Sequence, residues 1–360
     1  MIIKASSKDY EVIVNNNFDV IEKLQIDKDT YVVIDKKLYN IYVERLFNKI
    51  PKDQLYIFES IEENKTIESA LQICEIMTNI PAKRNAKLIS FGGGIVQDVT
   101  GFVANVLYRG IHWTFYPTTL LAACDSCIGG KTSLNYKKFK NLLGTFYPPD
   151  QIQICTPFFK SLSEKDFESG LGEVVKFNVM YGEKGIKKVE ENINLLLARD
   201  EKTLEEFVYN SLAFKKAFIE QDEFDRGIRI HLNYAHTFGH AFETMSNYVI
   251  PHGTAVAMGM IVANRISLMR GWLKESIVNR IENVIWKIIH VDIQSIPMNM
   301  DVIMAAIRKD KKQTSTDLTA VLMKPDMSLL VVHDVKTSEI KTAITYLFDN
   351  LRRPAMKSQV

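Results

Sequence analysis

The sequence is poor in cysteine and has almost no excess of charge of either sign. Four cysteines occur in 360 residues, at Cys74, Cys124, Cys127 and Cys155. This number is too small for a disulfide-stabilised scaffold and favours reduced thiols in a cytoplasmic protein. Lys and Arg number 45 against 43 Asp and Glu, a net charge of +2. We therefore expect no nucleic-acid partner and no membrane partner, because either would require a strongly basic surface.

Long hydrophobic runs are also missing from the sequence. The uncharged stretch between Arg109 and Asp125 is interrupted by Pro117. It is shorter than the roughly 18 to 20 apolar residues that a membrane span requires. Near the start of the chain, Lys4 and Lys8 interrupt any apolar segment of signal-peptide length. The sequence therefore predicts neither membrane insertion nor export.

The first part of the chain has the pattern of a parallel β-sheet with crossover helices. Short β-branched runs alternate with amphipathic stretches such as 66–79. Strands are expected at 31–35, 54–58, 87–91 and 111–115. Residues 1–155 are therefore predicted to form a Rossmann-like α/β domain that binds a dinucleotide.

The second part of the chain is predicted to be mostly helical. Apolar residues recur at three- and four-residue spacing over 162–218 and 255–290. A hairpin is expected at 319–323 and 328–333, before a last helix at 337–351. Residues 156–360 are therefore predicted to form a helical domain that binds a metal and the substrate.

Three consecutive glycines, Gly92 to Gly94, directly follow the third expected strand. A backbone without side chains at the start of a helix lets a pyrophosphate approach closely. The spacing differs from G-x-G-x-x-G, so a purely structural tight turn is an equal alternative. Asp35 ends an earlier strand, where an acidic residue commonly binds a ribose hydroxyl, although a helix N-cap is an equal alternative.

Four of the seven histidines lie between residues 231 and 252. His236 and His240 are four residues apart and share one helix face, and His252 follows after a turn. These three side chains suit a divalent metal, and a carboxylate ligand is expected from elsewhere. Glu173 is the candidate, because an unpaired carboxylate in its apolar helix would be costly to bury. Lys176 lies one turn further along that helix.

Basic side chains adjoin small residues at several other positions. Lys131 follows two glycines, but Asp125 stands where a P-loop has its first glycine, which argues against a nucleoside triphosphatase. Cys124 and Cys127 form an isolated Cys-x-x-Cys, which we interpret as packing residues. Lysine and arginine are suited to phosphate and carboxylate groups, with solvated surface charge as the alternative. The remaining members of this basic group are Arg109, Lys140 with its neighbour Asn141, Lys311 and Lys312.

Together these motifs resemble the sugar phosphate cyclases, and within them the 3-dehydroquinate synthase family. The resemblance extends from Asp35 to Lys312. It rests on several blocks in the same order. These are Glu62-x-x-Lys65, Gly92-Gly-Gly-x-x-x-Asp98, Tyr108-Arg-Gly110, Pro117-Thr-Thr-Leu-Leu-Ala122, Asp125-Ser-x-x-Gly-Gly-Lys-Thr132, Lys140-Asn141, Gly170-Leu-x-Glu-Val-Val-Lys176, Asn233-x-x-His-Thr-Phe-Gly-His240, His252-Gly253 and Asp310-Lys-Lys312.

The resemblance implies a role for each matching residue. Glu173, His236 and His252 would bind zinc or cobalt, which leaves His240 unligated near the substrate. NAD would be held by Asp35, Glu62, Lys65, Gly93, Gly94, Asp98, Thr118, Thr119 and Lys140. The substrate pocket would be lined by Arg109, Asp125, Lys131, Asn141, Lys176, Lys215, Arg229, Asn233, His240, Lys311 and Lys312.

The resemblance also implies a reaction in the shikimate pathway, the route to the aromatic amino acids. The family converts 3-deoxy-D-arabino-heptulosonate 7-phosphate into 3-dehydroquinate and phosphate, with NAD regenerated in each turnover. Hydride leaves the substrate for NAD, phosphate is eliminated, hydride returns, and the opened sugar closes to a carbocycle. A homodimer in the cytoplasm is the expected form of the protein.

The sequence departs from the family pattern at a few positions. Gln97, Gly172 and Ala235 replace a glycine, an alanine and a glycine, and Thr254 replaces a glutamate. These changes leave room for a specialised paralogue, such as an amino-dehydroquinate synthase. A metal- and NAD-dependent polyol dehydrogenase is a further alternative, but it would have no use for groups that bind phosphate and carboxylate. A non-catalytic binding module would gain nothing from so many buried polar groups.

Overall fold

The computed structural model describes residues 1–360 with the exception of 80–82, 138, 292–295, 297, 310–317 and 353–360. The chain forms two compact units. The first consists of Met1–Ser163 and Arg199–Phe224, and the second of Glu164–Ala198 and Asp225–Val360. No described helix combines the length and the apolar character needed to cross a membrane. The predicted domains, residues 1–155 for the dinucleotide and residues 156–360 for the metal and the substrate, stay a prediction.

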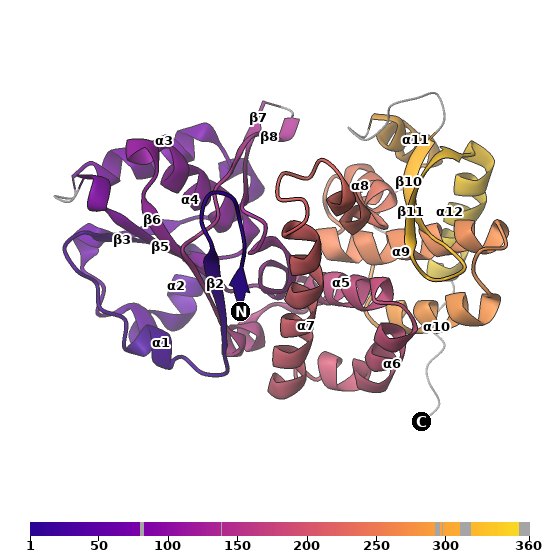
Figure 1. Ribbon diagram of the computed structural model, residues 1–360, viewed down its shortest axis with the longest axis horizontal. Coiled ribbons are helices and arrows are strands. Elements are labelled where there is room, and N and C mark those ends of the chain that lie inside the picture. The colour runs from indigo at the N-terminus through magenta and orange to yellow at the C-terminus, as the bar shows by residue number, and fades with distance from the viewer. Residues whose placement is uncertain (80–82, 138, 292–295, 297, 310–317, 353–360) are drawn as a thin grey trace. The chain divides into compact units, whose positions relative to one another are not determined.

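The first unit contains a seven-stranded sheet in the order β1-β2-β9-β6-β5-β3-β4. Only β1 and β2 pair antiparallel, and the other neighbours pair parallel. Helices α1 and α2 lie on one face and α3 and α4 on the other (Figure 1). The bounds are β1 (Ile2–Ile3), β2 (Tyr10–Asn15), α1 (Asp19–Glu22), β3 (Thr30–Asp35), α2 (Lys36–Tyr42), β4 (Leu55–Phe58), α3 (Ile67–Met77), β5 (Lys87–Gly92), α4 (Gly94–Val106), β6 (His112–Pro117) and β9 (Gln151–Cys155).

The predicted α/β class is confirmed, because all four expected strands are present within two residues of their predicted bounds. The run Tyr31 to Ile34 in β3 is buried along its whole length, as a central parallel strand covered on both faces requires. The sequence analysis did not identify β2 and β9. These two strands extend the sheet on the side of β6.

The strand order creates a topological switch between β3 and β5. From β3 the chain moves outward to β4, then returns to the other side of β3 and continues through β5 to β6. In open parallel sheets, ligands bind at the carboxyl ends of the strands where the winding direction reverses. Asp35 ends β3, and Gly92 ends β5, so these two positions flank this point.

Two further elements complete the first unit. The hairpin β7 (Lys131–Tyr136) and β8 (Phe139–Phe146) forms a separate two-stranded sheet and contacts α4. The helix α7 (Glu201–Ile219) packs against the single helical turn Ala122–Ser126. The sequence analysis expected α7 within the helical second part. It did not predict the hairpin, because the apolar residues of its strands do not alternate regularly with polar ones.

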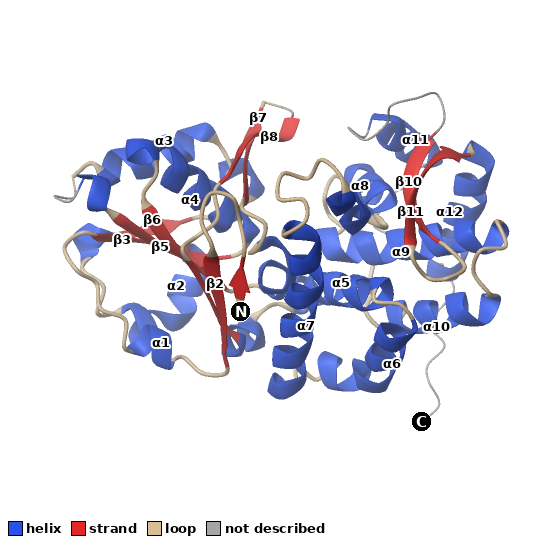
Figure 2. Ribbon diagram, in the orientation of Figure 1, coloured by secondary structure: helices blue, strands red, loops and turns tan. Residues whose placement is uncertain are grey.

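The second unit is mostly helical, as predicted, with one antiparallel hairpin (Figure 2). The helix α9 is buried around most of its circumference and contacts α5, α8, α10 and α12. A helix that is apolar all round belongs at the centre of a bundle. The bounds are α5 (Glu164–Met180), α6 (Glu183–Leu197), α8 (His236–Met245), α9 (His252–Met269), α10 (Glu275–Ile285), α11 (Met300–Lys309), β10 (Leu318–Met323), β11 (Leu329–Val335) and α12 (Thr337–Leu351).

Asp150 joins the segments at the amino ends of β6 and β9. Its carboxylate accepts from the backbone N–H of Trp113 at 2.8 Å and lies 3.0 Å from both Lys8 Nζ and His112 Nδ1. Burial acts to raise the pKa of Asp150, but these three partners outweigh burial, and the pKa lies below its ordinary value of 3.8. The ionised carboxylate is therefore favoured by folding.

We expect Asp150→Asn to lower the free energy of unfolding at pH 7 by about 1–3 kcal/mol, because the backbone and Lys8 lose a charged acceptor. The folded-state pKa is depressed, so this contribution is complete above about pH 5 and is lost as the pH falls through the lowered value. Urea unfolding at pH 7 and at about pH 3 should show the difference between variant and wild type shrinking at the lower pH. Asp53→Asn, at an exposed carboxylate, is the control; an equal, pH-independent loss in both variants would contradict the assignment.

Candidate functional site

Three predicted metal ligands come together in the second unit. Glu173 from α5 and the first residues of α8 and α9, His236 and His252, have ligand atoms within 4.8 Å of one another. Glu173 Oε1 lies 3.5 Å from His236 Nε2 and 3.4 Å from His252 Nε2. Two ligands bound to a tetrahedral zinc at about 2.0–2.1 Å are roughly 3.3 Å apart. The spacing therefore fits one shared divalent ion.

The surroundings of Glu173 also fit a cation. Its side chain is completely buried, and no hydrogen bond of normal geometry reaches either carboxylate oxygen from the residues that the structure describes. Lys176 Nζ, itself buried, lies 2.5 Å from Oε2. Lys176 compensates the charge at Oε2, and a metal ion would supply a close partner for Oε1, which faces the two histidines.

The ring of His252 lies between two carboxylates. Nε2 faces Glu173, and Nδ1 lies 3.2 Å from Glu243 Oε2. Burial acts to lower the pKa of His252, but the hydrogen bonds and charges of the two glutamates raise it to about 10. The two carboxylates thus stabilise positive charge at this position, which also favours a bound cation.

Glycines allow the three helices to approach closely enough to form this group. A Cβ on Gly253 would lie 1.7 Å from the backbone oxygen of Ser169 in α5, and one on Gly172 would lie 2.0 Å from the oxygen of Gly253. Each of these glycines adjoins a ligand, His252 or Glu173. The Ser169 hydroxyl accepts from the Gly253 N–H at 3.0 Å. The absence of side chains at this crossing brings the carboxylate and the imidazole together.

The start of α8 is held in the same way. Ala235 has φ of 69°, in the left-handed region, and a Cβ on Gly259 of α9 would lie 2.3 Å from its backbone oxygen. Ala235 is one of the positions where the sequence departs from the pattern it resembles, and its Cβ makes the left-handed conformation strained. Gly172 in place of alanine is consistent with the tight crossing, whereas nothing in the structure explains Thr254.

The expected dinucleotide residues of the first unit gather at the carboxyl ends of β3, β5 and β6. Gly93 precedes α4, and a Cβ on it would lie 3.0 Å from Thr119 Cγ2. Thr118 donates its N–H to the oxygen of Gly92 at 2.9 Å. Asp35 Oδ1 accepts from the Leu38 N–H and so caps α2. Asp35 is therefore the N-cap of α2, one of the two roles expected from the sequence. Its other carboxylate oxygen could still accept a hydrogen bond from a ribose hydroxyl.

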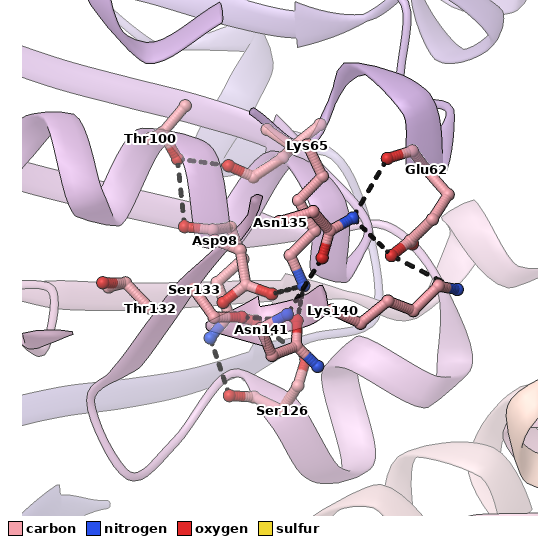
Figure 3. A network of polar contacts seen from close by, with 12 residues as sticks. Glu62, Lys65, Asp98, Thr100, Ser126, Thr132, Ser133, Asn135, Lys140 and Asn141 are labelled. Atoms are coloured by element: carbon pink, nitrogen blue, oxygen red, sulfur yellow. Dashed lines mark hydrogen bonds and ion pairs between the residues drawn. The ribbon is translucent and has the colours of Figure 1, made fainter. Parts of the chain in front are cut away.

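A network of polar side chains connects these dinucleotide residues with the hairpin of β7 and β8 (Figure 3). Lys65 Nζ lies 2.5 Å from Asp98 Oδ2 and donates to Asn141 Oδ1 at 2.6 Å. Burial raises the pKa of Asp98, and the ammonium of Lys65 and the hydroxyl of Ser133 counteract part of that rise. The network thereby connects three residues that lie far apart in the sequence.

The outer part of the network links Glu62 with the hairpin. Asn135 Nδ2 donates to Glu62 Oε1 at 2.8 Å, and Lys140 Nζ lies 3.4 Å from the same oxygen. Asn135 Oδ1 accepts from the N–H of Asn141, which has φ of 53°. The sequence analysis did not identify Asn135 or Ser133, because asparagine and serine on a polar hairpin give no distinct signal.

Gln97, noted above as a departure from the pattern that the sequence resembles, connects two elements of the first unit. Its amide group donates to the Ser126 backbone oxygen at 2.7 Å and accepts from the Ser126 hydroxyl at 2.8 Å. It therefore fastens α4 to the turn that carries Asp125. In the same unit, Lys215 from α7 lies 2.8 Å from Asp125 Oδ1 and donates to the Asp125 backbone oxygen at 2.5 Å.

The remaining expected site residues fall into both units. Arg109 and Lys131 are exposed in the first unit. In the second unit, Arg229 is buried, Asn233 ends the same short helix, and the His240 ring centroid lies 5.5 Å from that of His236. The ligand atom of His240 lies near those of Glu243 and His252. Among the described residues it forms no group with Glu173 and His236. The sequence-based interpretation that His236, His240 and His252 share one ion from a common helix face therefore gives way to the set with Glu173. Lys311 and Lys312 lie outside the described residues.

Comparison with known proteins identifies the family. Residues 55–169 match the 3-dehydroquinate synthase N-terminal family and residues 170–313 the 3-dehydroquinate synthase C-terminal family. The 3-dehydroquinate synthase of Clostridium tetani is 35% identical over 343 residues, which are 93% of this chain and 89% of that protein. The chain belongs to the 3-dehydroquinate synthase family.

Two solved structures of related cyclases support the predicted fold. A 2-epi-5-epi-valiolone synthase from Streptomyces hygroscopicus subsp. jinggangensis 5008, with NAD+ and Zn2+ bound, matches with a TM-score of 0.83 at 21% identity over 95% of this chain and 97% of that chain. A 2-deoxy-scyllo-inosose synthase in complex with carbaglucose-6-phosphate, NAD+ and Co2+ matches with a TM-score of 0.80 at 25% identity over 97% and 99%. The α/β part and the helical part predicted from the sequence are therefore those of a sugar phosphate cyclase.

We expect Gly253→Ala to lower the free energy of unfolding by more than about 3 kcal/mol, because the added methyl group must displace the backbone of α5. Ser169→Ala is the matched control, since it removes one hydrogen bond at the same crossing without a clash and should cost about 1 kcal/mol. Urea unfolding monitored by circular dichroism gives both values. Equal stability of Gly253→Ala and wild type would contradict the close approach of α5 and α9.

Proposed function

We propose that this chain catalyses the 3-dehydroquinate synthase reaction, the conversion of 3-deoxy-D-arabino-heptulosonate 7-phosphate to 3-dehydroquinate and phosphate. The observation that carries the proposal is the buried carboxylate of Glu173 facing two imidazole nitrogens at 3.4 and 3.5 Å. This arrangement occurs in a chain of the family whose Clostridium tetani relative bears that name. The reaction would serve the shikimate pathway and aromatic amino acid biosynthesis.

NAD and a divalent metal, zinc or cobalt, are the proposed cofactors. The related 2-deoxy-scyllo-inosose synthase was solved with NAD+ and Co2+. When bound, NAD would take up and return a hydride, and the metal would acidify the hydroxyl at the reacting carbon. Glu173, His236 and His252 would hold the metal. The residues that would hold NAD are Asp35, Glu62, Lys65, Gly93, Gly94, Asp98, Thr118, Thr119 and Lys140.

The switch between β3 and β5 supports this assignment of the dinucleotide. Gly93 and Gly94 start α4, where backbone N–H groups and the helix dipole favour a pyrophosphate. Lys65 and Asp98 form an ion pair at 2.5 Å, and this contact fixes the orientation of both side chains. We propose that these residues bind the cofactor rather than only stabilise the turn.

The substrate would be oriented by the basic residues. We propose that Arg109, Lys131 and Asn141 bind the phosphate, and that Arg229 with Lys311 or Lys312 binds the carboxylate. His240 and Asn233 would orient hydroxyls or relay protons. Lys176, at 2.5 Å from Glu173, would compensate the buried negative charge beside the reacting hydroxyls. We propose that Asp125 and Lys215, which form an ion pair at 2.8 Å, also contact the substrate.

Homodimer formation and a cytoplasmic location belong to the same proposal. Four cysteines in 360 residues are too few for a disulfide-stabilised scaffold, which favours a reducing compartment. A specialised paralogue acting on an amino analogue of the sugar acid remains the second candidate, because Ala235 and Thr254 depart from the family pattern. A polyol dehydrogenase would share the cofactors but would stop at oxidation.

Phosphate release distinguishes these activities. With NAD, Co2+ and the heptulosonate phosphate, we expect inorganic phosphate to form without net accumulation of NADH, because the hydride returns to the ring within each turnover. A malachite-green assay and absorbance at the NADH band would be recorded together. Stoichiometric NADH without phosphate would indicate a dehydrogenase. Turnover of only the amino analogue would indicate the paralogue.

We expect Glu173→Ala to lose stoichiometric zinc binding and to turn over at least about 100-fold more slowly, because the ion loses its only anionic ligand. Zinc per chain would be measured after gel filtration, and turnover by phosphate release. Glu191→Ala, at an exposed carboxylate of α6, is the control and should bind zinc as the wild type does. Stoichiometric zinc and normal turnover in Glu173→Ala would refute the metal assignment.

A further inference from the structure

The two histidines of the metal group are each fixed by a hydrogen bond at Nδ1, and the two acceptors differ. His236 Nδ1 lies 3.0 Å from the backbone oxygen of Tyr234. A carbonyl oxygen only accepts, so Nδ1 carries the proton and the lone pair of Nε2 is directed at Glu173. The backbone position of this acceptor is secured, because the Tyr234 hydroxyl donates to Asn264 Oδ1 at 2.6 Å and both side chains are fully buried.

His252 has a side-chain acceptor in place of a backbone carbonyl. Its Nδ1 lies 3.2 Å from Glu243 Oε2, and its Nε2 lies 3.4 Å from Glu173 Oε1. The side chain of His252 is 31% exposed, against 11% for that of His236. The packing around His252 is therefore looser, and its ring depends more on a specific hydrogen bond to stay in one orientation.

Glu243 is well placed to provide this bond. It lies two turns after His236 on α8, and its side chain is 15% exposed. α8 is held against α9, on which His252 is the first residue, by the close approach of Gly239 and Gly259 to the facing backbones. The carboxylate and the imidazole are thus brought together by the same helix packing that forms the metal group.

We propose that Glu243 is a positioning residue for the metal ligand His252. Its carboxylate accepts the Nδ1 proton and so orients the ring with Nε2 toward Glu173, where Nε2 would bind the ion and would be more basic as a ligand. This inference rests on the proposed metal site and assigns to Glu243 a function that no ligand motif in the sequence indicated. Glu243 acts through His252 and does not itself bind the ion.

The alternative role of Glu243 is direct ligation. His240, Glu243 and His252 also have ligand atoms within 4.8 Å of one another. Nδ1 of His252 cannot both donate a proton to Glu243 and bind a cation. A second ion at these three residues would therefore require an imidazolate bridge, so the number of ions per chain separates the two roles.

The experiment is a Co2+ titration of the metal-free full-length protein, followed by visible absorption and by competition with a chelating dye. Wild type is expected to bind one ion per chain. Glu243→Ala should still bind one ion, with an affinity about 10- to 100-fold lower. Glu243→Gln should lie clearly closer to wild type, because its amide oxygen can accept the same Nδ1 proton without the charge.

Glu168→Ala is the matched control. Glu168 lies on α5, its side chain is also 15% exposed, and it too accepts from a histidine Nδ1, that of His290 at 2.6 Å. Removing it should leave the Co2+ affinity unchanged, since His290 belongs to no metal group among the described residues. Circular dichroism and thermal unfolding of each metal-free variant would show that any loss of affinity does not come from a loss of structure.

Four outcomes would overturn the proposal for Glu243. These are wild-type affinity in Glu243→Ala, equal losses in Glu243→Gln and Glu243→Ala, a similar loss in Glu168→Ala, and two ions in wild type with one in Glu243→Ala. Failure of the metal site itself looks different. In that case Glu173→Ala would bind Co2+ like wild type, and both the proposed function and the role of Glu243 would be refuted.

Discussion

The close approach of three helix backbones is the constraint on which the metal group depends. α9 meets α5 at Gly172 and Gly253 and meets α8 at Gly239 and Gly259, where a Cβ would overlap or crowd the facing backbone. Each crossing adjoins a ligand, so the distance between backbones sets the distance between ligand atoms. Such packing holds a functional group more accurately than loops do. It also requires that the helices carry small residues at fixed positions, which limits how far the sequence can vary there.

Charged groups in the first unit are ordered by one another rather than by the hydrophobic core. Lys65, Asp98 and Asn141 come from different elements and meet within 2.6 Å. Burying such groups costs free energy, and their mutual contacts offset only part of that cost. An arrangement that stabilises the fold weakly but presents fixed donors and acceptors is typical of sites prepared for a polar ligand.

The sequence predicted the elements whose periodicity is strong and missed those whose periodicity is weak. The strands at 31–35 and 87–91 are short runs dominated by apolar residues, and both were found within two residues of their bounds. The hairpin of β7 and β8 was missed, because apolar and polar residues do not alternate regularly along its strands. Glu173 was identified because a carboxylate among the apolar residues of the second half of α5 is unusual. Glu243 was not identified as a partner of His252. The two residues meet only because α8 packs on α9, and the local sequence does not indicate this packing.

The first unit is not continuous in the sequence, because α7 belongs to it while the segments on both sides of α7 belong to the second unit. A gene fragment ending at Ser163 would lack α7 and with it Lys215, the partner of Asp125. Neither half could therefore be obtained as a simple truncation with its polar groups complete. If relatives exchanged the first unit, the exchange would also have to include the 26 residues Arg199–Phe224, which are encoded within the second half of the gene. The two units are therefore expected to be inherited together.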